Sequence, residues 1–103
     1  MTEITRLNSE LVARILTSEA AASPALRRAA FDNAGLTEPI RALIEKVAQR
    51  SYEVTDKDIA EVRKAGFSED QVFELVVSAA VGQANRHYTS GLAALADATG
   101  AQR

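Results

Sequence analysis

The chain has 103 residues and a formal net charge of −2 at pH 7, with charges of both signs spread along its length. This length is that of a single domain. The scattered charge excludes nucleic acid as the main partner, because phosphate binding needs a clustered basic surface. The absence of cysteine excludes disulfides, thiolate metal sites and dithiol redox chemistry.

Membrane association is excluded by the distribution of apolar residues. The longest stretch almost without charge runs from Leu75 to Asn85, whereas a spanning helix needs about 20 apolar residues. Residues 1–6 contain no apolar run of the kind that signal peptides carry. We therefore expect a cytoplasmic protein with no membrane partner.

The first half of the chain predicts three helices. Apolar residues at helical spacing predict the first helix over residues 9–21, with Asn8 or Ser9 as its N-cap. Ser23 followed by Pro24 is typical of a helix start and predicts a short second helix, which residues 32–35 end. Residues 37–39 repeat this start signal before a third helix, whose apolar face is Ile40, Leu43, Ile44 and Val47.

The second half predicts two more helices with strong start signals. Thr55 and Asp58 form an acidic capping box for the fourth helix, and Gly66 is a natural residue to end it in the left-handed conformation. Ser68 and Gln71 form the capping box of the fifth helix.

The fifth helix is the longest predicted element. No proline interrupts it between Glu69 and Asp97, and the next strong stop is Gly100. Such a helix would be about 44 Å long, which is more than a globule of about 13 Å radius of gyration can enclose. We therefore expect it either to break near Gly82 or Gly91, or to project and be covered by something else.

The predicted fold is an all-α, five-helix bundle with a long Ala-rich C-terminal helix. Residues 1–35 are expected to form an N-terminal helical arm and residues 36–100 the helical core of one compact domain. One stripe of the last helix should face the core or a partner subunit; it consists of Phe73, Val77, Ala80, Ala84, His87 and Gly91. Because one short chain has few helices to cover both sides of this helix, we expect a homo-oligomer.

Two segments before the long helix carry a family resemblance. Val54-Thr-Asp-Lys-Asp and Ala65-Gly-Phe-Ser-Glu-Asp lead into the Ala-rich helix, which bears the pair Asn85-Arg86. In this order they resemble the C-terminal half of the alkylhydroperoxidase D-like, carboxymuconolactone decarboxylase superfamily. The resemblance covers about residues 36–95 and implies an all-α fold and an obligate homo-oligomer, commonly a trimer or a hexamer.

The redox centre of that superfamily is absent here. Its peroxidase branch carries a Cys-x-x-Cys-x-x-x-His motif upstream of the matching segment, whereas Met1–Gly35 contain neither Cys nor His. Dithiol peroxidase activity is therefore excluded, because its first step needs a thiolate. The decarboxylase branch lacks the dithiol and uses other residues, none of which maps onto this chain.

The densest polar cluster of the last helix is the candidate site. His87 is the only histidine and, with Tyr88, is the candidate for proton transfer on a small carboxylate. The candidate ligand-binding residues are Arg86, Arg41, Tyr52, Glu74, Gln83 and Asn85, with the arginines placed to hold the carboxylate. The alternative interpretation is structural: His87 and Arg86 then form hydrogen bonds across an oligomer interface.

Glu74 has a functional and a structural interpretation of its own. It lies beside Phe73 near the start of the last helix, where a buried carboxylate could transfer protons. In the structural interpretation it pairs with Arg41 or Arg86, or reaches solvent. We expect no metal and no cofactor, because one histidine, no cysteine and no carboxylates at ligand spacing leave no set of metal ligands.

Three functions remain open from the sequence. The first is a non-redox, homo-oligomeric assembly or small-molecule-binding module. The second is a cysteine-independent enzyme of the carboxymuconolactone decarboxylase type. The third is an accessory subunit that docks through Met1–Gly35. A helix-turn-helix over residues 56–71 is rejected, because Glu69, Asp70 and Glu74 would repel DNA phosphates.

Overall fold

The computed structural model describes residues 3–17 and 20–100, and within these residues it contains helices and no strand. The prediction of an all-α fold with five α-helices is therefore confirmed. The helices are α1 (Glu3–Thr17), α2 (Pro24–Asp32), α3 (Ile40–Arg50), the short 3-10 helix η1 (Ser51–Glu53), α4 (Asp56–Lys64) and α5 (Glu69–Thr99).

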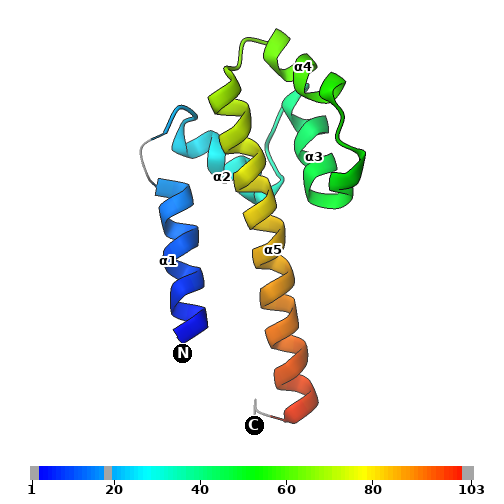
Figure 1. The fold of residues 1–103 in the computed structure, drawn as a ribbon. Helices are drawn as coiled ribbons and strands as arrows, with labels where there is room; N and C mark the ends of the chain where they lie inside the picture. The colour runs from blue at the N-terminus through cyan, green and yellow to red at the C-terminus, as the bar shows by residue number, and fades with distance from the viewer. Residues whose placement is uncertain (1–2, 18–19, 101–103) are drawn as a thin grey trace.

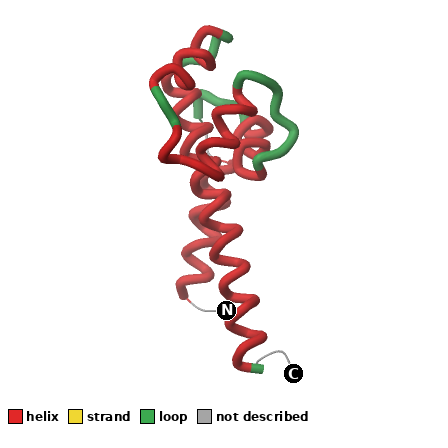
Figure 2. The backbone as a smooth tube through the Cα atoms, turned by 90° about the vertical axis from the view of Figure 1, so that its right-hand side faces the viewer, coloured by secondary structure: helices red, strands yellow, loops and turns green. Residues whose placement is uncertain are grey.

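The long helix α5 is the axis of the molecule (Figure 1). Helices α2, α3 and α4 gather around its first half, whereas α1 runs antiparallel beside its middle. The last turns of α5 extend beyond α1 in both views, so this end of the helix projects from the rest of the protein (Figure 2). The dimensions are 52 × 29 × 20 Å, and the radius of gyration of 15.6 Å exceeds the roughly 13 Å of a compact chain of this size.

The hydrophobic core lies between α5 and the helices around its first half. It contains Ala22, Ala30, Leu36, Ile40, Leu43, Ile44, Val62, Val72, Leu75 and Ala79. Ala30 and Phe31 of α2 are buried as deeply as residues of α3 and α5. Residues from both the expected arm and the expected core therefore contribute to one hydrophobic core.

Helix α5 continues without a break through both of its internal glycines. Ser68 and Gln71 form the expected capping box, and Gly100 ends the helix in the left-handed conformation with φ of 70°. Gly82 is buried where α5 meets the end of α2, and a Cβ at this position would lie 2.0 Å from the Phe31 carbonyl oxygen. The glycine is thus required for close approach of two helices rather than for a kink. Of the two expected alternatives, the helix projects.

The starts of two helices differ from the prediction. Helix α1 begins at Glu3, so Asn8 lies within it, and the side-chain amide of Asn8 donates to Asn85 Oδ1 at 2.8 Å. Ala20 and Ala21 are not helical, and residues 18 and 19, which the prediction included, lie outside the described residues. Helix α3 has Pro39 as its N-cap residue and no side-chain cap from Thr37.

The start of α4 joins a capping box to an ion pair. The Thr55 backbone N–H donates to Asp58 Oδ2 at 2.9 Å, and Lys46 Nζ of α3 donates to both Asp58 oxygens at 3.0 and 3.1 Å. The Thr55 N–H and then Lys46 lower the pKa of the Asp58 carboxyl below its ordinary value of 3.8. The carboxylate thereby fixes α4 against α3.

This pKa shift makes a prediction about acid stability. The pKa of Asp58 is lower in the folded state than in the unfolded state, so the charged carboxylate stabilises the fold. This stabilisation is fully present above about pH 3.8, and it is lost as the pH falls through the pKa of the folded state. We expect Asp58→Asn to lower the unfolding free energy at pH 7 and to have progressively less effect below pH 3.8. Urea unfolding of both proteins across this pH range measures the difference in unfolding free energy. A difference that does not change with pH would contradict the prediction.

Candidate functional site

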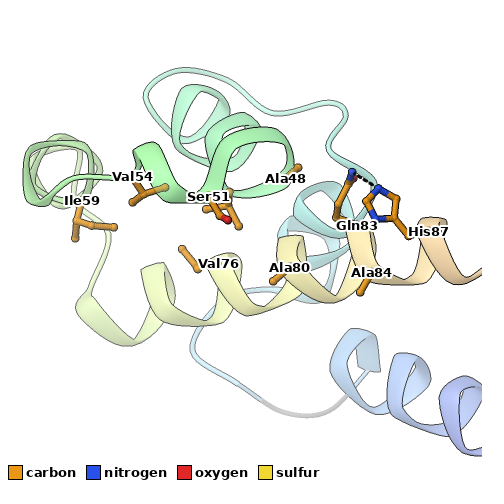
Figure 3. A pocket seen from close by; sticks show the side chains of 10 residues that line it. Ala48, Ser51, Val54, Ile59, Val76, Ala80, Gln83, Ala84 and His87 are labelled. Carbon is orange, nitrogen blue, oxygen red and sulfur yellow. Dashed lines mark hydrogen bonds between the residues drawn. The ribbon is translucent and has the colours of Figure 1, made fainter.

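An open groove separates α5 from the segment formed by the end of α3, η1 and the start of α4. Its volume is about 590 Å³, within the range of roughly 300–1,000 Å³ that small-molecule sites occupy. Side chains from both walls point toward one another across it (Figure 3). They are Val47, Ala48, Ser51, Val54 and Ile59 on one wall and Val76, Ala80, Gln83, Ala84 and His87 on α5. Most of this surface is apolar.

The polar end of the groove is formed by Gln83 and His87. Gln83 Oε1 accepts a hydrogen bond from Arg86 Nη2 at 2.7 Å, so its amide nitrogen faces His87 Nε2 at 3.1 Å (Figure 3). An amide nitrogen can only donate, and therefore His87 Nε2 accepts and the neutral ring carries its proton on Nδ1. This nitrogen is occupied and is not available as a general base without breaking the bond.

Arg86 points away from the groove. Its Nη1 donates to the Phe31 carbonyl oxygen at 2.6 Å, and Phe31 lies in the last turn of α2. The final carbonyls of a helix lack partners within the helix and carry partial negative charge, which a guanidinium neutralises well. Arg86 therefore caps α2 instead of facing a ligand in the groove.

Tyr88 and Asn85 bind helix α1. The Tyr88 hydroxyl lies 2.9 Å from Thr5 Oγ1, and Asn85 Oδ1 accepts from the Asn8 amide at 2.8 Å. These two contacts join segments that are about eighty residues apart in the sequence and hold α1 beside the middle of α5. Tyr88 is thus not directed at the groove that His87 borders.

Arg41 and Tyr52 lie on the surface. Arg41 forms an exposed ion pair with Glu38 at 2.8 Å, and the Tyr52 side chain on η1 is 83% exposed. The structure therefore brings together Gln83, Arg86 and His87, but it does not gather the whole set of expected site residues into one pocket.

Glu74 has a structural partner that neither interpretation of the sequence included. Its two carboxylate oxygens accept from the backbone N–H groups of Ala21 and Ala22 at 3.0 and 2.7 Å. Gln71 adds a hydrogen bond from its amide nitrogen to the Ala21 carbonyl at 3.3 Å. Glu74 does not pair with Arg41 or Arg86; it holds the segment before α2 against α5.

Arg27 is a buried residue that the sequence analysis missed. Its side chain is 3% exposed, and Nη1 donates to the Ile15 carbonyl at 2.6 Å, in the last turn of α1. The signal for its burial was present, because Ala30 and Phe31 follow it at the spacing of one helix face. Arg27 caps α1 as Arg86 caps α2, so two arginines bind the ends of the two N-terminal helices.

One side of α5 is left uncovered. We call it the outer face and define it by Phe73, Ala80, Ala84, His87, Gly91 and Leu95, all of which are exposed. The core side of the helix consists of Val72, Leu75, Ser78, Ala79 and Gly82. None of the six residues of the expected stripe is buried in the core: Val77 is half-buried, and Ala80, Ala84 and His87 border the groove opposite α3 and η1.

Comparison of the chain with known protein families, proteins and structures identifies no similar protein. No family model, curated protein or solved structure matches the chain. Among the described residues, no helix is both long and apolar enough to cross a membrane. The same residues contain no group of three or more His, Asp or Glu that could hold a metal ion. The groove and the outer face are therefore the features of this chain that can carry a function.

Proposed function

We propose that the protein is a non-redox helical module that assembles with copies of itself through the outer face of α5. The observation that carries this proposal is the exposure of large apolar side chains along an ordered helix. Phe73 is 68% exposed and Leu95 is 61% exposed, at opposite ends of the outer face. Exposed apolar surface that extends along one element is typical of a protein interface.

The charge distribution along α5 supports the same function. Charged residues make up 25% of the chain, yet no exposed residue of α5 from Phe73 to Leu95 is Asp, Glu, Lys or Arg. The two charged side chains of this stretch, Glu74 and Arg86, bind backbone groups of the segment before α2 and of α2 itself. A helix face that is solvated in the functional state normally carries charge, whereas the centre of an interface is depleted of it.

The fold is consistent with a cysteine-less member of the alkylhydroperoxidase D-like superfamily, in which case assembly would be a trimer or a hexamer. The capping boxes at Thr55 and Ser68 coincide with the two segments that carry the resemblance. A carboxylate-directed enzyme has less support, because Arg86 and Tyr88 bind other parts of the chain.

Ala84→Arg tests the proposal. Ala84 lies at the middle of the outer face and is exposed in the single chain, so the longer side chain should leave the helical fold of the subunit intact, which circular dichroism checks. It should, however, convert the oligomer to monomer, because it places a charge at the centre of an apolar contact. Sedimentation velocity measures the change.

The control is Ala60→Arg, which introduces the same side chain at an exposed position of α4. The Ala60→Arg protein should retain the oligomer. Equal masses for the two variants would contradict assembly through the outer face.

A second function is supported by the groove. Its apolar walls and the polar end at Gln83 and His87 suit a small, mainly apolar molecule with one hydrogen-bonding group. Titration with 1-octanol should shift the methyl resonances of Val54 and Val76, which line the groove, and leave those of the buried Val62 unchanged.

His87→Gln tests whether the groove binds octanol without changing the stability of the fold. His87 is exposed, and we expect its replacement to weaken octanol binding while changing the unfolding free energy by no more than about 0.5 kcal/mol. The ring contributes one hydrogen bond and part of the groove wall, so a several-fold loss of affinity is expected. Unchanged affinity, or equal shifts at Val54 and Val62, would rule out binding in the groove.

A further inference from the structure

We infer that the groove takes a neutral aliphatic carbonyl compound, such as a medium-chain ketone or ester, with its carbonyl oxygen at His87 and its chain directed toward Val76. The inference rests on the proposed binding function of the groove and adds the chemical class and the orientation of the ligand. Three features of the described residues lead to it: the hydrogen-bond donors at the polar end, the absence of charge in the walls, and the order of the wall residues along α5.

The hydrogen bonds at the polar end of the groove fix the direction of the Gln83 amide. Arg86 Nη1 donates to the Phe31 carbonyl oxygen at 2.6 Å, and Arg86 Nη2 donates to Gln83 Oε1 at 2.7 Å. The amide cannot turn around, because its nitrogen would then face two donors of the guanidinium. It therefore stays directed at His87 Nε2, 3.1 Å away, and the neutral ring keeps its proton on Nδ1.

Two N–H groups remain at this end for a ligand. The first is Nδ1–H of His87, which forms no hydrogen bond with the described residues, and the second is the other N–H of the Gln83 amide. His87 lines the groove, and its ring is turned back along α5 toward Gln83 (Figure 3). Both groups donate and neither accepts, so the ligand atom that meets them must be an acceptor. The Ser51 hydroxyl on the opposite wall can donate or accept and does not change this requirement.

The acceptor is neutral, because the groove offers a charged ligand no partner. None of the described side chains that line it is Asp, Glu, Lys or Arg. Moving a carboxylate out of water costs far more than moving a carbonyl oxygen unless a positive charge compensates it. Arg86, which adjoins His87 in the sequence, is already bound to Phe31 and Gln83. A carbonyl oxygen is thus the acceptor that the polar end binds at the lowest cost.

The order of the wall residues orients the ligand. His87 lies at one end of the groove, and Val54 and Val76 lie at the other (Figure 3). Val76 and His87 are eleven residues apart on α5, which is about 16 Å along the helix axis. Ala80 and Ala84 lie between them, and their short side chains leave room along this path. An extended aliphatic chain can therefore lie along α5 with its carbonyl at the polar end and its tail at the apolar end.

A series of ligands with the same chain length tests the chemical class. Binding is followed at mildly alkaline pH, where imidazole is neutral, by the methyl resonances of Val54 and Val76, with the buried Val62 as the control. We expect 2-octanone to bind at least as tightly as 1-octanol. Octylammonium should bind about tenfold more weakly than 2-octanone, because it leaves the two donors without an acceptor. The net charge of −2 attracts this cation, so repulsion cannot be the cause of its weak binding. Octanoate should also bind more weakly than 2-octanone.

The single histidine of the chain permits a direct check of the polar end. Long-range ¹H–¹⁵N correlation spectra distinguish the two neutral tautomers of its ring, and we expect the Nδ1–H form both with and without 2-octanone. The Nε2–H form would overturn the inference, because the ring would then offer the ligand an acceptor.

The two methyl groups of 2-octanone report its orientation. The methyl group beside the carbonyl should show nuclear Overhauser effects to the His87 ring, and the methyl group at the end of the chain should show them to Val76. The reverse pattern would overturn the inferred orientation.

The remaining outcomes distinguish the ligand class from binding itself. If 1-octanol binds but 2-octanone does not, or if octylammonium or octanoate binds more tightly than 2-octanone, the ligand class is wrong and binding in the groove stands. If no ligand of the series shifts Val54 and Val76, the groove is not a binding site and the inference is overturned with it.

Discussion

Gly82→Ala is expected to lower the unfolding free energy by about 3 kcal/mol, since overpacking a close contact costs this much when the structure cannot relax. The added Cβ would lie 2.0 Å from the Phe31 carbonyl oxygen and 2.7 Å from its carbon. Both are backbone atoms, so no side-chain rotation relieves the clash and α2 must move away from α5. The Arg86 bond to the same carbonyl would be strained as well.

Gly91→Ala is the matched control, because it makes the same substitution in the same helix. A Cβ at Gly91 meets nothing within 4 Å, and alanine favours the helix over glycine by about 1 kcal/mol. We expect this variant to be equal to the native protein or more stable. Urea unfolding compares the two, and similar effects at both positions would show that α2 does not approach α5 closely at Gly82.

Glu74→Ala is expected to lower the unfolding free energy by about 2–3 kcal/mol, since a hydrogen bond to a charged group contributes this much. The substitution removes the acceptor of two backbone N–H groups, at 3.0 and 2.7 Å. The more costly loss is at Ala22, which is 1% exposed, because its N–H would remain buried without a partner.

Two further substitutions test whether the lost hydrogen bonds cause the destabilisation expected for Glu74→Ala. Glu74→Gln retains one oxygen acceptor, so its loss of stability should fall between those of Glu74→Ala and the native protein. Glu45→Ala removes the same side chain from an exposed position of α3 and should change the unfolding free energy by no more than about 0.5 kcal/mol. If Glu45→Ala were as damaging as Glu74→Ala, the contact with the segment before α2 would not be the reason.

The helix ends that carry local signals could be predicted from the sequence. Ser23, Thr55 and Ser68 are N-caps as expected, and Thr55 and Ser68 complete capping boxes with the residues three positions on. These helix starts are predictable because the side chain of an N-cap residue bonds to a backbone N–H only three residues further along the chain. No distant part of the structure is needed to form the cap.

The partners of polar residues far apart in the sequence could not be predicted in the same way. Asn8 was expected to cap a helix, yet it binds Asn85 and allows α1 to begin at Glu3. Arg86 and Arg27 were not expected to bind the ends of α2 and α1. Each of these contacts depends on which helices lie side by side, and this is set by the packing of the core rather than by local sequence.

The candidate site was predicted only in part for the same reason. The sequence places Gln83, Arg86 and His87 in one polar cluster of the last helix, and the structure joins them by hydrogen bonds. The spacing alone could not show that Tyr88 turns toward Thr5 or that the stripe with His87 is left exposed. The face of α5 that enters the core carries Val72, Leu75 and Ala79, and Gly82 on the same face lets α2 approach closely.

The mass of the native assembly tests the central claim most directly. Native mass spectrometry of the purified full chain counts its subunits and detects any small molecule retained in the groove. Self-assembly through the outer face of α5 predicts a defined oligomer, which Ala84→Arg dissociates. A native protein that remains monomeric at micromolar concentrations would contradict the account, because the exposed Phe73 and Leu95 would then be covered by nothing.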